Sequence, residues 1–185
     1  VNYGGIAGWG TYGQAGKSNV FAMGSSPQGY RNYHWQSDLV ATTRSSAAFS
    51  GNWNHVVAQF DGTTQRIYEN GFLLATNTAT LSVTGTNNLT IGMANGNEWF
   101  NGCLSNLRIV KGVAVYSGVS TTAANFTVPT RFLTATQSSS TNIAAITGTQ
   151  TALLLNNRNN LLQDASTWGY TLTAYNSPSI SSSGP

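Results

Sequence analysis

The stretch WNHVVAQF-DGT-TQRIYE at residues 53–69 decides the fold class. Its Asp-Gly pair lies between two runs rich in β-branched and aromatic residues, which is a strong signal for a β-hairpin. Successive side chains of a strand point to opposite faces, and neither face of residues 53–60 is purely polar, so we expect a central strand there. A second turn, Glu-Asn-Gly at residues 69–71, extends the prediction to a three-stranded antiparallel meander over residues 53–76.

Short β-branched and aromatic runs separated by Gly, Asn, Ser and Thr continue along the chain, without the pattern of a long amphipathic helix. The predicted strands are residues 5–9, 20–23, 31–35, 39–42, 53–60, 64–69, 72–76, 89–93, 102–110, 152–155 and 170–174. Many short strands at such spacing are typical of a sandwich or a barrel. The sequence therefore predicts an all-β fold, an antiparallel β-sandwich.

The composition narrows the class of protein. The chain has 185 residues, enough for one domain with a full core, and only 7% of them are charged, against roughly 25% in typical soluble domains. A surface made soluble by hydroxyl and amide groups is typical of extracellular adhesins, lectin-like modules and viral coat proteins. The cations behind the net charge of +3 are scattered singly, which argues against nucleic-acid binding, because phosphate contacts need clustered cations.

Two further patterns concern the membrane and covalent links. We find neither a secretory signal pattern nor an apolar run near the roughly 20 residues that span a bilayer, so we expect no membrane insertion. The one cysteine, Cys103, allows no intrachain disulfide. It lies in the apolar run Gly-Cys-Leu at residues 102–104, and we expect it to be a small buried core residue.

Five strand and turn motifs follow one another between residues 51 and 110. The matching positions are Trp53, His55, Val56 and Val57 (W-x-H-V-A), Asp61 and Gly62 (D-G), Tyr68, Asn70 and Gly71 (Y-x-N-G), Leu89, Ile91 and Gly92 (n-l-x-I-G), and Phe100, Gly102, Leu104, Leu107, Arg108 and Ile109 (F-x-G-x-I-x-x-L-R-I). With these motifs the segment resembles the laminin-G-like branch of the concanavalin A-like lectin/glucanase superfamily. The resemblance implies a jelly-roll sandwich with His55 as a hydrogen-bonded core residue, and it does not identify a ligand.

A narrower resemblance begins at the end of that segment. Residues 108–116, RIVKGVAVY, and residues 125–130, NFTVPT, are similar to a segment of such domains in bacteriophage structural proteins. The resemblance implies a non-enzymatic structural or adhesion component of the virion surface, in a capsid decoration, a head fibre or a tail fibre. Its implied partners are other copies of the chain, as a homo-oligomer, and other virion proteins, with host-surface glycans as a further candidate.

The chain departs from these relatives at its two ends. They usually open with an L-L-L strand and a D-x-S-G turn, whereas here Leu-Leu-Leu at residues 153–155 and Asp-Ala-Ser at 164–166 come late. Either residues that precede Val1 are missing, or the C-terminal segment completes the sandwich in this copy or a neighbouring one, since an unfilled sheet edge tends to pair. We therefore predict pairing over residues 152–175.

This interpretation gives three segments. Residues 1–133 are the predicted sandwich, residues 134–151 are a Ser/Thr-rich connector, and residues 152–185 carry the C-terminal strands.

The acidic residues argue against an enzyme. Glycoside hydrolysis needs two carboxyl groups roughly 5 to 9 Å apart, and no two of the five acids lie within six residues of each other. A pair brought together by folding, such as Asp38 with Glu98, would revive the glycosidase hypothesis. His34 has no cysteine or aspartate spaced for a zinc site or a triad. The superfamily leaves Ca²⁺ open, with Asp38 as the first ligand to examine, but with so few acids we predict no metal site and no cofactor.

The remaining functional signal is aromatic. Trp and Tyr side chains in Gly/Asn-rich surroundings can stack on sugar rings, and neighbouring amides and carboxylates can bind sugar hydroxyls. The candidate carbohydrate-binding residues are Trp35, Asp38, Asn97, Glu98 and Trp99, with residues 95–99 expected at a loop tip. The competing interpretation is that the aromatic residues belong to the core or to a subunit interface. The alternative function is a free lectin-like module of a secreted bacterial protein.

Overall fold

The computed structural model describes residues 3–10, 13–15, 18–25, 28–45, 51–82, 87–94, 97–156 and 160–181. Every regular element among them is a β-strand, and every strand pair is antiparallel, which confirms the predicted all-β antiparallel fold. The chain divides into two compact units. Unit 1 comprises Val1–Gly102 and Val119–Ala124, and unit 2 comprises Cys103–Gly118 and Asn125–Pro185. Within the described residues, no helix has the length and apolarity to cross a membrane.

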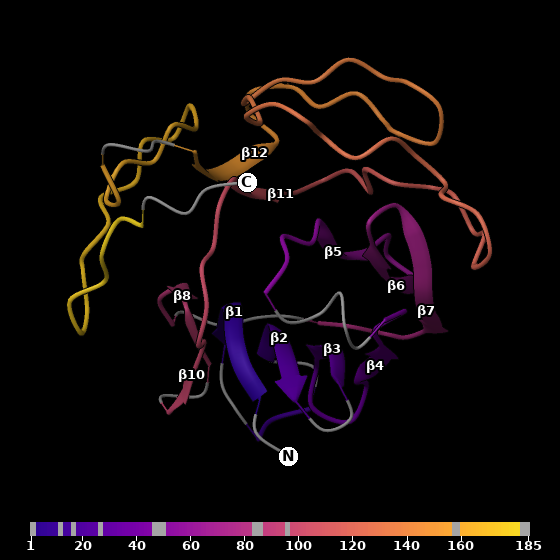
Figure 1. Ribbon diagram of the computed structural model, residues 1–185, viewed down its shortest axis with the longest axis horizontal. Coiled ribbons are helices and arrows are strands. Elements are labelled where there is room, and N and C mark those ends of the chain that lie inside the picture. Colours follow the sequence, from indigo (N-terminus) through magenta and orange to yellow (C-terminus); the bar gives the residue numbers. More distant parts are fainter. Residues whose placement is uncertain are drawn as a thin grey trace. The chain divides into compact units, whose positions relative to one another are not determined.

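The larger sheet of unit 1 has the strand order β4-β3-β2-β1-β8. Its strands are β1 (Tyr3–Gly10), β2 (Ser18–Ser25), β3 (Gln28–Tyr33), β4 (Leu39–Thr42) and β8 (Thr90–Ile91). The four N-terminal strands form a meander, seen side by side in Figure 1. Strand β3 ends at Tyr33, two residues before the end of the predicted strand 31–35. The chain then turns into β4, and Gln36 in this turn adopts a positive φ of 67°.

The second sheet of unit 1 is the meander that residues 53–76 predict. It consists of β5 (Val56–Phe60), β6 (Thr64–Glu69) and β7 (Phe72–Thr78). The prediction started β5 too early, since residues 53–55 are outside the strand. The three strands pair in register on both sides of β6, with one irregularity between Ile67 and Tyr68.

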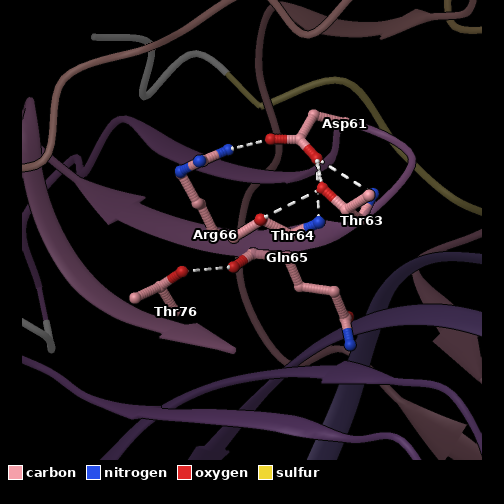
Figure 2. Close-up of polar contacts among 6 residues, drawn as sticks. All are labelled: Asp61, Thr63, Thr64, Gln65, Arg66 and Thr76. Carbon is pink, nitrogen blue, oxygen red and sulfur yellow. Dashed lines mark hydrogen bonds and ion pairs between the residues drawn. The ribbon is translucent and has the colours of Figure 1, made fainter. Parts of the chain in front are cut away.

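The Asp61 carboxylate organises the turn between β5 and β6 (Figure 2). Its Oδ1 accepts hydrogen bonds from the backbone amides of Thr63 at 3.0 Å and Thr64 at 2.8 Å. Arg66 Nη1 donates to the other oxygen at 2.5 Å. The bond from Arg66 and these amide bonds lower the pKa of Asp61 well below its usual range. The Asp-Gly signal of the sequence thus corresponds to a turn that its own aspartate closes.

An apolar cluster joins the two sheets of unit 1. Tyr30, Leu39 and Ala41 of the first sheet and Ile67 of the second are all buried. Phe21, Met23, Val56, Leu74 and Ala75 pack against them. On β4, Leu39 and Ala41 face this cluster, while Val40 between them is 50% exposed. The period of two along the strand therefore separates a core face from an outer face.

Two polar side chains of β6 lie on either side of Ile67 and bind the first sheet. Glu69 is 3% exposed, and its carboxylate accepts hydrogen bonds from the Tyr30 hydroxyl at 2.8 Å, Thr43 Oγ1 at 2.7 Å and the Arg44 amide at 3.0 Å. These three bonds fix the end of β4 on the second sheet.

The second side chain, Gln65, is fully buried. Its Oε1 accepts a bond from Asn32 Nδ2 at 2.9 Å, and its Nε2 donates to the Ser37 carbonyl at 2.7 Å. Gln65 therefore holds both β3 and the turn that follows it.

Two strands of two residues each, β9 (Met93–Ala94) and β10 (Glu98–Trp99), form a hairpin that follows β8 in unit 1. The predicted single strand 89–93 is divided at Gly92, where φ is 77°. The predicted loop tip is partly wrong, because Glu98 and Trp99 pair with β9; Asn95 and Gly96 lie outside the described residues.

Unit 2 is built around β11 (Leu107–Val110) and β12 (Thr151–Leu155), which pair antiparallel. The predicted strand 102–110 is therefore mostly wrong, and Cys103, expected in the core, is exposed. The sequence 170–174 contributes one bridge, from Thr171 to Gln163, rather than a strand. The boundaries of the three predicted segments stay a prediction.

Asp164 ties the chain beyond β12 to that strand. Its carboxylate accepts hydrogen bonds from the backbone amides of Leu154 at 3.0 Å, Ser166 at 2.9 Å and Tyr170 at 2.9 Å, and from Ser166 Oγ at 2.8 Å. Burial alone raises the pKa of Asp164, but these bonds outweigh it and lower the pKa below its usual value.

The hydrogen bond between Tyr30 and Glu69 gives a direct stability test. Replacing Tyr30 by Phe removes one donor from a buried carboxylate, and we expect the free energy of unfolding to fall by about 1.5 to 3 kcal/mol in urea titrations. Tyr3→Phe is the matched control and should change it by less than about 0.5 kcal/mol. Equal effects of the two substitutions would contradict the bridging role of Glu69.

Candidate functional site

The candidate site lies on the outer face of the first sheet of unit 1. Phe21 and Met23 of β2 pack against the core between the sheets, so Val20 and Ala22 point to the opposite face. Because β3 pairs with β2 at Ala22 and Val20, its residues Arg31 and Tyr33 share that face. Half-buried polar and aromatic groups therefore line a face whose centre consists of small side chains.

Gly24 makes room for an aromatic ring on this face. A Cβ at residue 24 would lie 2.6 Å from Cδ1 of Tyr3, so the Tyr3 ring occupies the space that any other residue would fill. The ring thereby reaches from β1 across β2 towards β3. Its centre lies 5.4 Å from the Arg31 guanidinium carbon, and the Tyr33 ring lies 4.3 Å from the same atom. Two tyrosines thus flank one guanidinium within cation–π distance.

Asp38 completes this charged centre. Arg31 Nε donates to Asp38 Oδ2 at 3.0 Å, and Arg31 Nη2 forms an ion pair with the same oxygen. The backbone amide of His34 donates to Asp38 Oδ1 at 2.9 Å. Burial alone lowers the pKa of Arg31, but Asp38 and then Tyr3 and Tyr33 raise it above its usual value, so the guanidinium stays charged.

Trp35 adjoins the same centre. It follows β3 in the turn to β4, and its ring lies 6.3 Å from the Tyr33 ring at an interplanar angle of 51°. The structure thus brings two of the five predicted residues, Trp35 and Asp38, into one cluster with Arg31, Tyr33 and Tyr3. We call these five residues the Arg31 cluster.

A buried histidine, His34, lies in the chain between Tyr33 and Trp35 of the Arg31 cluster. His34 is 1% exposed, and its Nδ1 lies 3.0 Å from the Ser18 carbonyl, which makes Nδ1 the donor in the neutral ring. Its Nε2 is buried without a hydrogen-bond partner among the described residues. Burial lowers the pKa of His34 below its usual range, and the Ser18 carbonyl and the Asp38 carboxylate oppose this shift only in part.

The other three predicted residues border the same face from the side of β1. Ala94 of the β9–β10 hairpin packs with Val20 and Ala22, and Tyr3 and Tyr33 pack against this small cluster. The hairpin can approach because a Cβ on Gly5 would lie 2.5 Å from Ala94 Cβ.

Of these three residues, Asn97 and Trp99 are exposed, Trp99 by 45%, and Glu98 is half-buried. The predicted set therefore forms two groups along one face. Carbohydrate binding by either group stays a prediction.

Sequence reasoning missed Arg31 and Tyr3. The sequence could have indicated Arg31, because it lies two residues before Tyr33 and therefore on the same face of β3. Tyr3 gave no sequence signal, because its place depends on the space above Gly24 on a neighbouring strand.

Most carboxylates of the chain are held by donors. Asp38 and Asp61 pair with Arg31 and Arg66, and Glu69 and Asp164 each accept at least three hydrogen bonds. The described residues contain no group of three or more His, Cys, Asp or Glu side chains placed to hold a metal ion. The arrangement is suited to binding through stacking and hydrogen bonds.

A family model of the concanavalin A-like lectin/glucanases superfamily matches residues 4–120. The chain belongs to this superfamily. Comparison with the curated proteins and with the solved structures gives no match.

Membership of the concanavalin A-like lectin/glucanases superfamily suggests a carbohydrate-binding or adhesion-type module. The matched residues include the whole Arg31 cluster except Tyr3, and all of the β9–β10 hairpin. Aromatic rings beside a charged pair offer a sugar both an apolar surface and hydrogen-bonding groups.

The buried His34 predicts a pH dependence of stability. In the unfolded chain a histidine binds its proton near pH 6.5, whereas the folded protein lowers the pKa of His34. Between these two pKa values the unfolded state binds more protons, so stability must fall as the pH is lowered through pH 6.5, by up to about 1.4 kcal/mol per pH unit.

Urea titrations at pH 7 and pH 5 test this, with His34→Gln as the variant. The wild type should lose more stability than the variant over this interval. Equal losses would contradict the assignment of the slope to His34.

Proposed function

We propose that this chain is a non-enzymatic adhesion or structural module that contacts carbohydrate through the Arg31 cluster. The observation that carries the proposal is the guanidinium of Arg31, flanked by Tyr3 and Tyr33 and paired with Asp38. Sugars combine apolar ring faces with hydroxyl groups, and this cluster offers aromatic surface next to a fixed donor and acceptor pair. Trp35 on one side and Trp99 on the β9–β10 hairpin would extend that surface.

The proposed setting is the surface of a bacteriophage particle. Its support is the resemblance of residues 108–116 and 125–130 to such domains in capsid decorations, head fibres and tail fibres. The proposed partners are host-surface glycans, other virion proteins and identical chains in a homo-oligomer.

The proposal of an oligomer is supported by large exposed apolar side chains in the last part of unit 2. They include Leu161, Leu162, Trp168, Tyr170 and Ile180, each at least 40% exposed. Contacts with a neighbouring chain would remove this surface from water, which is favourable at roughly 25 cal/mol per Å².

A glycan array with aromatic variants tests the carbohydrate proposal. We expect the wild type to bind at least one glycan, and Trp35→Ala to weaken that binding about ten-fold, because central aromatic side chains contribute more than about 1.4 kcal/mol. Trp53→Ala is the matched control, since Trp53 is 41% exposed but precedes the second sheet. Binding that is equally weakened by both variants, or absent from the array altogether, would remove the lectin function.

The second candidate function is a free lectin-like module of a secreted bacterial protein, which the same aromatic cluster and superfamily membership support. Immunogold labelling distinguishes the two settings, with an antibody raised against the chain and applied to particles and to cleared supernatant of the source culture. Label on particles is the expected outcome. Label confined to the supernatant would instead establish the free module.

A further inference from the structure

The charges of the chain divide unevenly between its two units. Unit 1 contains four Lys or Arg residues and four Asp or Glu residues, so its formal net charge is zero. Unit 2 contains Arg108, Lys111, Arg131 and Arg158 against Asp164 alone, so the whole net charge of +3 belongs to unit 2.

The single acid of unit 2 is outnumbered by its four cations. Asp164 is 9% exposed and receives its hydrogen bonds from backbone amides and from Ser166. The ion pairs among the described residues, Arg31 with Asp38 and Arg66 with Asp61, are both in unit 1. An excess of positive charge attracts anions.

Two of the cations line an open cavity of about 310 Å³ in unit 2. This volume is at the lower end of the roughly 300 to 1,000 Å³ of ligand pockets, and the cavity is widely open to solvent, so it has room for one small group such as a single sugar residue. Its walls are Arg108, Arg131, Gln137 and the segment Val128–Thr134. Most of these residues lie beyond the matched residues 4–120 and outside the Arg31 cluster.

Arg108 forms the fixed part of the cavity. It lies on β11 opposite Leu154, and its Nη1 donates to the Thr134 carbonyl at 3.1 Å while Nη2 donates to Gln137 Oε1 at 2.7 Å. Both acceptors are neutral oxygens, so these bonds orient the guanidinium without neutralising its charge.

Arg131 forms the exposed part. Its backbone carbonyl accepts a bond from Asn106 Nδ2 at 3.2 Å, and Asn106 Oδ1 accepts one from the Leu133 amide at 2.8 Å, so the segment that carries Arg131 is anchored at two points. The Arg131 side chain itself is exposed. Next to it Phe132, which is 46% exposed, adds an apolar surface to the wall.

We propose that this cavity binds an anionic sugar residue. Arg108 and Arg131 would bind its carboxylate or phosphate, since guanidinium groups match the geometry of both anions. Phe132 and Pro129 would contact the sugar ring, and the Thr130 hydroxyl would bind a hydroxyl group of the sugar. The site is separate from the Arg31 cluster and adds a ligand class, anionic saccharides, to the proposed function.

Ligand-observed NMR titrations test the site with matched probes. Glucuronate and glucose 6-phosphate carry the two anions, and glucose is the neutral counterpart. We expect at least one anionic probe to bind at least ten-fold more tightly than glucose. Its affinity should fall when the salt concentration rises, because both partners are charged.

Two charge-matched variants locate the binding. Arg131→Gln removes a cation from the cavity wall and should weaken the anionic probe about ten-fold. Lys111→Gln removes the same charge from unit 2 but from a side chain that lies over the Trp168 ring, 4.7 Å from its centre, and should change the affinity less than two-fold.

Several outcomes would overturn the proposal: equal affinity for glucose and both anionic probes, an unchanged affinity in Arg131→Gln, or equal losses in both variants, which would indicate unspecific attraction to the net charge. Trp35→Ala serves to separate this site from the Arg31 cluster. It should leave the anionic probe bound as in the wild type, whatever its effect on the glycan array.

Discussion

The fold of unit 1 depends on a constraint that acts at one strand. The inward side chains of β6 are Gln65, Ile67 and Glu69, all buried, and they meet the first sheet in turn as amide, apolar group and carboxylate. An apolar contact alone would permit sliding, because dispersion and the hydrophobic effect have little directional preference. A buried carboxylate or amide that lacks a hydrogen-bond partner lowers the stability of the fold. The hydrogen bonds of Gln65 and Glu69 therefore fix one register between the two sheets.

The same constraint positions the candidate site. Gln65 Nε2 holds the Ser37 carbonyl, and Asn77 Nδ2 lies 3.4 Å from the carbonyl of Asp38. The turn that carries Trp35 and Asp38 is therefore held from beneath by the second sheet, while its side chains remain on the outer face of the first. A rigid support of this kind lowers the entropy lost when a ligand orders the site.

Two glycines without side chains shape the outer face of the first sheet. Gly24 leaves space for the Tyr3 ring, and Gly5 leaves space for the β9–β10 hairpin. Larger side chains at these two positions would keep the ring and the hairpin away from the sheet. This explains why the sequence predicted the fold better than the site. The Asp-Gly and Asn-Gly turns and the alternation around them are local signals, and they located β5, β6 and β7. The approach of Tyr3 to Arg31 depends on strand order and on a space above a third strand, which no local pattern encodes.

The same distinction accounts for the other errors. Gly-Cys-Leu at residues 102–104 is an apolar run, but the strand begins only at Leu107, so the side chain of Cys103 has no sheet to direct it inward. The distribution of charge, in contrast, can be read from the sequence. Residues 103–185 contain four cations and one acid, so the excess that unit 2 carries is already present in the order of the residues. The fold adds the ion pairs of unit 1, Arg31 with Asp38 and Arg66 with Asp61. In an internal ion pair the acid offsets the charge of the cation and orients its side chain. A cation that is hydrogen-bonded only to neutral oxygens can still attract an anionic ligand. Singly spaced cations therefore do not exclude an excess of charge in one unit, and the two units differ in how their charges can act.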